Sequence, residues 1–248
     1  EYTYDSRGNV LTQKDHVTGA ITTFEYNAMD LKTAEISPLG YRREFVYTKN
    51  RQLYKEIQKD LNGTIVSTAI TVYDAMGRPI KRVAADQYNP ALDIGINTYT
   101  GDQGTRFEYT SAGFASKEID KLGQVTLHER DDYGNAIKTT LPNGSQWLFT
   151  YDKLNRMLTK SHKQDATATS VLLESWSYQI VGPNTVTVHT KHLNDTQSAV
   201  TTTEFDFAGR PLNVTSPDGS VVSHSYYPDG LIKETIDALG YKTHFKYD

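Results

Sequence analysis

A chain of 248 residues is long enough for one large β domain or two small ones with a core. Its 26 basic and 30 acidic residues are interspersed and give a formal net charge of −4, so it lacks the basic patch of a nucleic-acid-binding protein. It has no cysteine, which excludes disulfides and zinc–thiolate sites, and no apolar stretch is long enough for a membrane-spanning helix.

The first predicted element is a β-hairpin in "EYTYDSRGNVLTQKD". Tyr2 and Tyr4 share one face of a strand, because strand side chains alternate with a period of two. Asp5 and Gly8 predict a tight turn, since aspartate accepts hydrogen bonds from nearby backbone N–H groups and glycine tolerates positive φ. The segment "NVLTQ" supplies the second strand, and a second glycine-containing turn leads to the next hairpin.

This pattern recurs along the whole chain. We number each repeat unit from its second aromatic residue, position zero, which falls at Tyr4, Tyr26, Tyr47, Tyr73, Tyr109, Arg130, Tyr151, Tyr178, Phe205, Tyr226 and Tyr247. The basal spacing is 21 residues, with a few expansions, and such a period indicates a repeat architecture. We therefore predict one all-β domain over residues 1–248, an array of about ten tandem hairpins that begins and ends in mid-repeat and forms one continuous curved antiparallel sheet.

The aromatic residues at positions −2 and zero are predicted to form a structural ladder that stacks in register between units. The predicted ladder comprises Tyr2, Tyr4, Phe24, Tyr26, Phe45, Tyr47, Tyr73, Phe107, Tyr109, Phe149, Tyr151, Trp176, Tyr178, Phe205, Tyr226, Phe245 and Tyr247. The predicted turn residues are Asp5, Gly8, Asp74, Gly77, Asp152, Asp206 and Gly209. One unit buries too little apolar surface to fold alone, so the ladder must couple neighbouring units.

Two expansions interrupt the period. Residues 84–104, "AADQYNPALDIGINTYTGDQG", are too apolar for a flexible linker, and we expect them to pack over one face of the sheet or to cover a sheet edge. Residues 161–202 are predicted to form an extended hairpin with longer strands.

No catalytic, cofactor or metal site is predicted. His189 and His192 are three apart in a strand and should point to opposite faces, while His128 and His224 stand at position −2 as packed rings. The aspartates at position +1 are too far apart to give calcium its six to eight oxygen ligands. Phosphate-loop, G-x-S-x-G and H-E-x-x-H patterns are missing from the sequence.

The segments "YDSRGNV", "YDAMGRPI", "YDKLNRML" and "FDFAGRPL" resemble the YD-repeat or RHS-repeat family, which includes bacterial RHS polymorphic toxins, components of insecticidal toxin complexes and teneurins. The resemblance implies a segment of a hollow spiral β-shell that, in bacterial members, encloses a C-terminal toxin. The family's terminal Asp-Pro-x-Gly motif is absent, so its autoprotease is not expected here.

The resemblance predicts a structural, non-enzymatic segment of a bacterial shell, secreted or exposed at the cell surface. Its expected partners are the rest of a longer chain and an enclosed toxin, with edge-to-edge self-association through unpaired terminal strands. The alternative is an adhesion module that binds a carbohydrate or a protein with exposed aromatic faces.

Overall fold

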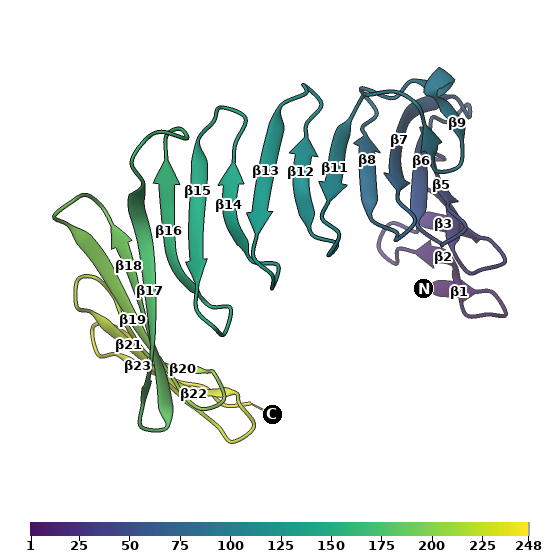
Figure 1. The fold of residues 1–248 in the computed structure, drawn as a ribbon. Helices are drawn as coiled ribbons and strands as arrows, with labels where there is room; N and C mark the ends of the chain where they lie inside the picture. Colours follow the sequence, from purple (N-terminus) through teal and green to yellow (C-terminus); the bar gives the residue numbers. More distant parts are fainter. Residues whose placement is uncertain (248) are drawn as a thin grey trace. The chain divides into compact units, whose positions relative to one another are not determined.

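The computed structural model describes residues 1–247; Asp248, which completes the last Tyr-Asp pair, lies outside the described residues. Contacts divide the chain into two compact units, Glu1–Val125 and the part from Thr126 onward, and each is described by itself (Figure 1). The organisation of the whole chain as a single domain stays a prediction.

The first unit is an antiparallel meander of short strands. Its strands are β1 (Tyr2–Tyr4), β2 (Val10–Lys14), β3 (Ile21–Tyr26), β4 (Lys32–Ile36), β5 (Arg42–Tyr47), β6 (Leu53–Lys59), β7 (Ile65–Tyr73), β8 (Pro79–Val83), β9 (Asp93–Gly95), β10 (Thr98–Tyr99), β11 (Thr105–Tyr109) and β12 (Ala115–Ile119). Strands β1 to β8 pair in sequence order, and β8 then pairs with β11 across the 84–104 insertion. The insertion holds a 3-10 turn, η1 (Pro90–Leu92), and a separate ribbon formed by β9 and β10.

The second unit repeats the same topology. Its strands are β13 (Val125–Arg130), β14 (Ala136–Thr140), β15 (Gln146–Tyr151), β16 (Met157–Lys163), β17 (Val171–Val181), β18 (Asn184–His192), β19 (Ser198–Phe205), β20 (Pro211–Thr215), β21 (Val221–Tyr226), β22 (Ile232–Ile236) and β23 (Lys242–His244). Each strand pairs antiparallel with its sequence neighbours. The 161–202 expansion lengthens β17 and β18 to 11 and 9 residues, as the sequence predicts.

The predicted fold class, tandem hairpins in a curved antiparallel sheet, is confirmed in each unit. In Figure 1 the strands of the first unit rotate progressively between β12 and β1, as the right-handed twist of β-strands requires. Most residues of either face are only half-buried, so each sheet is largely a single layer held by cross-strand pairs.

Among the described residues, a hydrophobic core forms only where the insertion adds a second layer. Tyr54, Ile70, Val72 and Val83 of β6–β8 are covered by Tyr99, with Tyr88 and Leu92 packed at the margin. Residues 84–104 therefore pack over a sheet face, the first of the two arrangements expected from the sequence. Among the described residues of the second unit, no hydrophobic side chain is fully buried.

Candidate functional site

The turn that follows position zero, the Tyr-Asp turn, is held by the aspartate at position +1. In the turn after Tyr151, Oδ1 of Asp152 accepts hydrogen bonds from the N–H groups of Leu154 (2.8 Å) and Arg156 (3.0 Å). Oδ2 of Asp152 accepts a bond from Nε of Arg156 at 2.7 Å. The carboxylate thus satisfies backbone donors that the turn would otherwise leave unpaired. The two backbone bonds to Oδ1 recur at Asp5, Asp74, Asp131 and Asp206.

Position +4 of the Tyr-Asp turn requires a left-handed backbone. Its φ lies between 59° and 94° at Gly8, Asp30, Arg51, Gly77, Gly113, Gly134, Asn155, Gly209 and Gly230. Glycine occupies this conformation without steric cost, and aspartate and asparagine tolerate it better than most residues. The positive φ at position +4 therefore explains why glycine recurs there in the repeated motif.

In several units the residue at position +5 joins its turn to the next hairpin. The guanidinium groups of Arg78, Arg156 and Arg210 each bond the aspartate of their own turn. The same groups lie over the rings of Tyr109, Tyr178 and Tyr226 in the following unit, at 4.5, 4.2 and 4.7 Å from the ring centroids. A carboxylate, a guanidinium and an aromatic ring thus link consecutive units.

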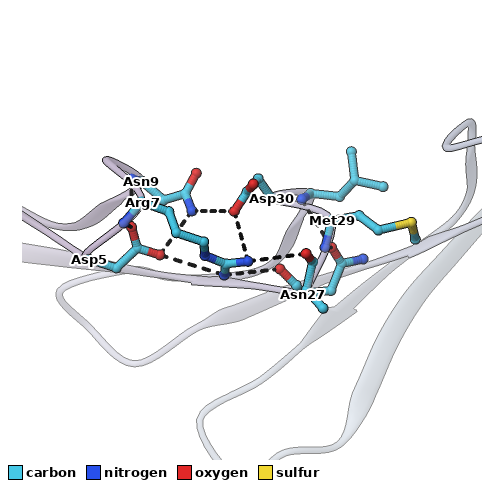
Figure 2. Close-up of polar contacts among 8 residues, drawn as sticks. Asp5, Arg7, Asn9, Asn27, Met29 and Asp30 are labelled. Carbon is cyan, nitrogen blue, oxygen red and sulfur yellow. Dashed lines mark hydrogen bonds and ion pairs between the residues drawn. The ribbon is translucent and has the colours of Figure 1, made fainter.

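Asparagine at position +5 makes a different link. Figure 2 shows Nδ2 of Asn9 bonded to Oδ2 of Asp5 (2.9 Å) and to Oδ1 of Asp30 (2.8 Å), which belongs to the next turn. Arg7 adds contacts with Asp30 (3.1 Å) and with the backbone carbonyl of Asn27 (3.3 Å). Asn135 makes the corresponding bond to Asn155 in the second unit.

The tyrosine at position zero also reaches back to the preceding hairpin. Its hydroxyl donates to the backbone carbonyl at position +6 of the previous unit in six cases: Tyr47 to Lys32, Tyr73 to Leu53, Tyr109 to Pro79, Tyr151 to Ala136, Tyr178 to Met157 and Tyr226 to Pro211. The donor–acceptor distances run from 2.6 Å at Tyr109 to 3.1 Å at Tyr151. Each of these hydroxyls therefore bonds the same backbone carbonyl position of the preceding unit.

The carbonyl at position +6 lies next to a β-bulge that recurs along the chain. In nine units the strand register shifts so that position +7 is an extra residue opposite the aromatic strand: Leu11, Thr33, Tyr54, Ile80, Ser116, Ile137, Leu158, Leu212 and Lys233. A bulge interrupts the hydrogen-bonded ladder and increases local twist. The hydroxyl from the next unit supplies a donor at this interruption.

The predicted stacking of ladder rings between units is wrong. Equivalent rings of consecutive units are separated by the second strand of a hairpin, about 10 Å for two strand spacings, which is too far for ring contact. Cationic side chains occupy the space instead, as Lys32 does over the rings of Phe24 (5.3 Å) and Phe45 (5.1 Å). Ring contacts of ladder residues arise within a strand, at Tyr2–Tyr4, across a strand pair, at Trp176–His189, and edge-on between Tyr247 and Tyr227 of the preceding unit.

Most predicted ladder residues are half-buried, whereas Tyr2, Tyr4 and Tyr247 are 52%, 58% and 50% exposed. Strand β1 pairs with β2 alone, which leaves the rings of Tyr2 and Tyr4 without a neighbouring strand on one side. The aromatic residues that project most into solvent lie in turns, at Tyr133, Phe207 and Tyr241.

The predicted histidine arrangement is seen in the structure. His189 stacks on Trp176 (4.6 Å between centroids) and bonds Glu174 at 2.8 Å, while His192 bonds Ser175 at 3.1 Å on the opposite face. His128 and His224 bond threonines on the adjacent strand, Thr139 and Thr235. Within residues 1–247, no three His, Asp or Glu side chains gather as a metal site would require.

The insertion is anchored by a buried acid that sequence reasoning missed. The side chain of Asp93 is 3% exposed; it contacts Lys55, and it accepts hydrogen bonds from the hydroxyls of Tyr54 and Tyr88, the latter at 2.6 Å. Tyr54 and Lys55 are consecutive yet both reach Asp93, because Tyr54 is the extra residue of a bulge. Asn97 adds two bonds to the backbone of Tyr73, at 2.7 and 2.9 Å.

The electrostatics of this cluster hold Asp93 in its charged form. Burial is the largest single effect and raises its pKa, but hydrogen bonds from Lys55, Tyr54 and Tyr88 together outweigh burial and place the pKa below the usual range. Burial and the neighbouring carboxylate raise the pKa values of Tyr54 and Tyr88, so both hydroxyls remain donors. The cluster is a satisfied anchor rather than an acid–base pair poised for catalysis.

The aspartates of the Tyr-Asp turns should make the folded protein less stable in acid. Hydrogen bonds from Arg156, first its N–H and then its guanidinium, lower the pKa of Asp152 despite burial, and Asp74 and Asp206 behave alike. Because these folded-state pKa values lie below the unfolded value near 3.8, the stabilisation is complete above that pH and disappears as the pH falls through the lower values.

We expect urea midpoints to be flat from neutral pH to about pH 5 and to fall steeply below about pH 4. In Asp152→Asn the slope in acid should be smaller by one titrating group. The substitution keeps the acceptor that caps the turn, as Asn27 does at the same position of another unit. An unchanged slope in this variant would contradict the assignment.

Tyr151 offers a test of the link between units. Tyr151→Phe removes the bond to Ala136 and should cost about 1 kcal/mol, whereas Tyr151→Ala also loses a half-buried ring and should cost about 2–3 kcal/mol. The cost expected for Tyr151→Ala is below the roughly 3–5 kcal/mol typical of fully buried aromatic residues, because the ring of Tyr151 is only half-buried. Equal urea midpoints for the wild type and Tyr151→Phe would show that the hydroxyl contributes nothing.

The fold and its repeated junctions define a class of protein: a tandem β-hairpin repeat protein whose units are joined through Tyr-Asp turns. The profile of the RHS Repeat family matches residues 4–42 and 130–167, and the resemblance to this family inferred from the sequence is confirmed. The two matched segments lie one in each unit.

Known proteins with similar sequences or structures are much longer than this chain. It is 27% identical over 174 residues to the probable deoxyribonuclease RhsB of Dickeya dadantii (strain 3937), covering 68% of this chain and 11% of RhsB. Among solved structures, TcdB2-TccC3 matches with a TM-score of 0.46 and 12% identity, and a Photorhabdus luminescens Tc holotoxin pore with 0.46 and 13%. Both matches cover 98% of this chain and 17% of the other.

The described residues contain no helix long and apolar enough to cross a membrane.

Proposed function

We propose that this chain is a segment of the wall of an RHS-type shell that encloses a toxin for delivery from a bacterium. In this role the chain binds the rest of a longer polypeptide and the enclosed cargo, and it performs no catalysis itself. The observation that carries the proposal is the repeated junction, in which six tyrosine hydroxyls bond the same carbonyl position of the preceding unit. Such a junction extends a sheet one hairpin at a time, as a wall requires.

The single-layer character of the sheets supports the same role. A globular domain closes both faces of a sheet over a core, whereas here the second unit buries no hydrophobic side chain fully among its described residues. Stability instead comes from pairs along the sheet, such as Arg42 with Glu25 (2.6 Å) and Glu44 (2.8 Å). The structure is suited to forming a thin extended surface.

Protection of the cargo is the decisive test. In limited proteolysis of the complete polypeptide that carries this chain, a region outside the repeats should survive, with its fragment identified by mass spectrometry. A Tyr151→Ala/Tyr178→Ala variant should expose that region, while Tyr133→Ala, at a ring that is 75% exposed, should not. Digestion of the region at the rate of a denatured control would contradict enclosure.

The scattering of the 248-residue chain tests its shape and its edges. A hollow curved body should have a radius of gyration well above the globular expectation of about 18 Å. Among the described residues, β1 pairs only with β2 and β23 only with β22, so edge-to-edge association should raise the apparent mass with concentration. A compact, concentration-independent particle would contradict both expectations.

If the chain acts instead as an adhesion module, the residues that bind the ligand would lie in the turns and not in the ladder. Ring faces at Tyr109, Tyr178 and Tyr226 are occupied by guanidinium groups, which leaves them poorly placed to stack on a sugar. Glycan binding that is lost in Tyr133→Ala and retained in the Tyr151→Ala/Tyr178→Ala variant would favour the adhesion role.

A further inference from the structure

Two turns of the chain contain an asparagine followed by a glycine. Asn62-Gly63 lies between β6 and β7, and Asn143-Gly144 lies between β14 and β15. In such a pair the amide nitrogen of the glycine can attack the carboxamide carbon of the asparagine, because glycine has no Cβ to hinder the approach. This reaction is one reason why asparagine is a thermolabile residue. Both turns therefore hold the atoms of a possible modification site.

The glycines of the two turns have similar surroundings. The N–H of Gly63 donates to the carbonyl of Asp60 at 3.1 Å, and that of Gly144 donates to the carbonyl of Leu141 at 2.9 Å. Their φ angles are +79° and +85°, and a Cβ on either glycine would meet no atom within 4 Å. The attacking nitrogens are thus held in the same way, so the asparagine side chains distinguish the two turns.

The carboxamide of Asn143 is fixed by hydrogen bonds. Its Oδ1 accepts bonds from the N–H of Ser145 (3.0 Å) and from the Ser145 hydroxyl (2.7 Å), and Ser145 is 5% exposed. Asp218 accepts the same two bonds from Ser220, at 3.0 and 2.7 Å, so the arrangement recurs in the chain. Two bonds must break before the carboxamide of Asn143 can turn toward Gly144.

The carboxamide of Asn62 is not fixed in this way. In its turn the capping acceptor is Oδ1 of Asp60, which accepts bonds from the N–H groups of Asn62 and Thr64, both at 2.9 Å. Within residues 1–247, the exposed side chain of Asn62 makes no hydrogen bond of its own. Because Asp60 already satisfies the backbone of the turn, the Asn62 carboxamide can rotate without loss of a bond.

We propose that Asn62 is a site of spontaneous deamidation, at which water converts the asparagine to aspartate and isoaspartate, and that the fold protects Asn143 from the same reaction. The amide nitrogen of Gly63 forms a bond to Cγ of Asn62, the bond from Cγ to Nδ2 breaks, and ammonia leaves with the proton of the Gly63 amide. Water then opens the resulting five-membered imide at either carbonyl and leaves one new carboxylate. This inference is independent of the proposed wall function.

The product changes the β6–β7 turn. Isoaspartate adds one methylene group to the backbone between Asn62 and Gly63, and its carboxylate lies in the same turn as that of Asp60. Cδ2 of Leu61 lies 3.3 Å from the place that a Cβ on Gly40 would occupy, so this turn packs against the corresponding turn of the preceding hairpin. The modification therefore acts on the contact between two hairpins.

Incubation of the intact chain at mildly alkaline pH, followed by digestion and mass spectrometry, measures both sites in one sample. The peptide with Asn62 should gain the mass that distinguishes an acid from an amide, and chromatography should separate its aspartate and isoaspartate forms. Asn143 should react at least roughly tenfold more slowly, because its two hydrogen bonds must break first. In urea, where the fold is lost, the two rates should become similar.

Variants of the residue two positions after each asparagine test the cause. Ser145→Ala removes the hydroxyl bond and should accelerate the reaction of Asn143 roughly fivefold. Thr64→Ala is the matched control and should leave the rate at Asn62 unchanged. Equal rates at the two sites in the folded chain would overturn the proposal, as would an unreactive Asn62. A difference that persists in urea would assign it to the flanking sequence and overturn the protection by the fold.

Discussion

Tyr54→Ala should lower the free energy of unfolding of the first unit by about 4 kcal/mol. Tyr54 is 1% exposed and is the largest member of the only cluster of buried hydrophobic residues among the described residues. Truncation leaves a cavity between β6–β8 and the insertion, and it also removes a hydroxyl donor from Asp93. Both effects act on the one region where the sheet has a second layer.

Urea unfolding followed by circular dichroism measures the effect. Tyr54→Phe retains the ring and should lose only about 1–2 kcal/mol, which separates packing from the hydrogen bond. Tyr133→Ala is the matched control, because its ring is 75% exposed and its loss should leave the midpoint unchanged. A midpoint for Tyr54→Ala equal to that of the control would show that the insertion does not cover a core.

Asp93→Ala should cost about 3–4 kcal/mol and should release the insertion from the sheet. The substitution leaves the ammonium group of Lys55 without its counter-charge and the hydroxyls of Tyr54 and Tyr88 without their acceptor. Buried donors without partners lose hydration and gain nothing in return. Asp93→Asn keeps an acceptor but no charge, so its effect should be intermediate.

Hydrogen exchange locates the effect of Asp93→Ala. Amides of residues 88–99 should exchange faster, while those of the second unit should not change. Asp102→Ala is the control, because that carboxylate is 91% exposed and its ion pair with Arg106 should contribute little. Equal exchange rates of the insertion amides in the wild type and in Asp93→Ala would refute the anchor.

Local sequence patterns were sufficient to predict the hairpins. Alternation of aromatic residues placed the strands, and Asp5 and Gly8 predicted a turn whose requirements are met within five residues. The opposite faces of His189 and His192 followed from the strand period alone. These features depend on backbone angles and near neighbours, which a short sequence specifies.

Contacts between hairpins were not predictable in the same way. The ladder rings were expected to stack, but the intervening strand separates them, and Arg156 fills the space over Tyr178. The Gly-Arg and Gly-Asn pairs in the repeated motif were the available signal for this link. Their partners lie one full unit away, at a distance set by strand pairing and bulges.

The repeat, the all-β fold and the Tyr-Asp turns are thus determined by the sequence itself, because each depends on residues a few positions apart. Only the tertiary structure reveals the anchor of the insertion, in which Asp93 meets Tyr54 from a strand 39 positions earlier. It likewise reveals that β8 pairs with β7 only over Ile70–Tyr73, because the chain leaves the sheet after Val83. Both depend on where a long connection returns to the sheet, and no local pattern specifies that position.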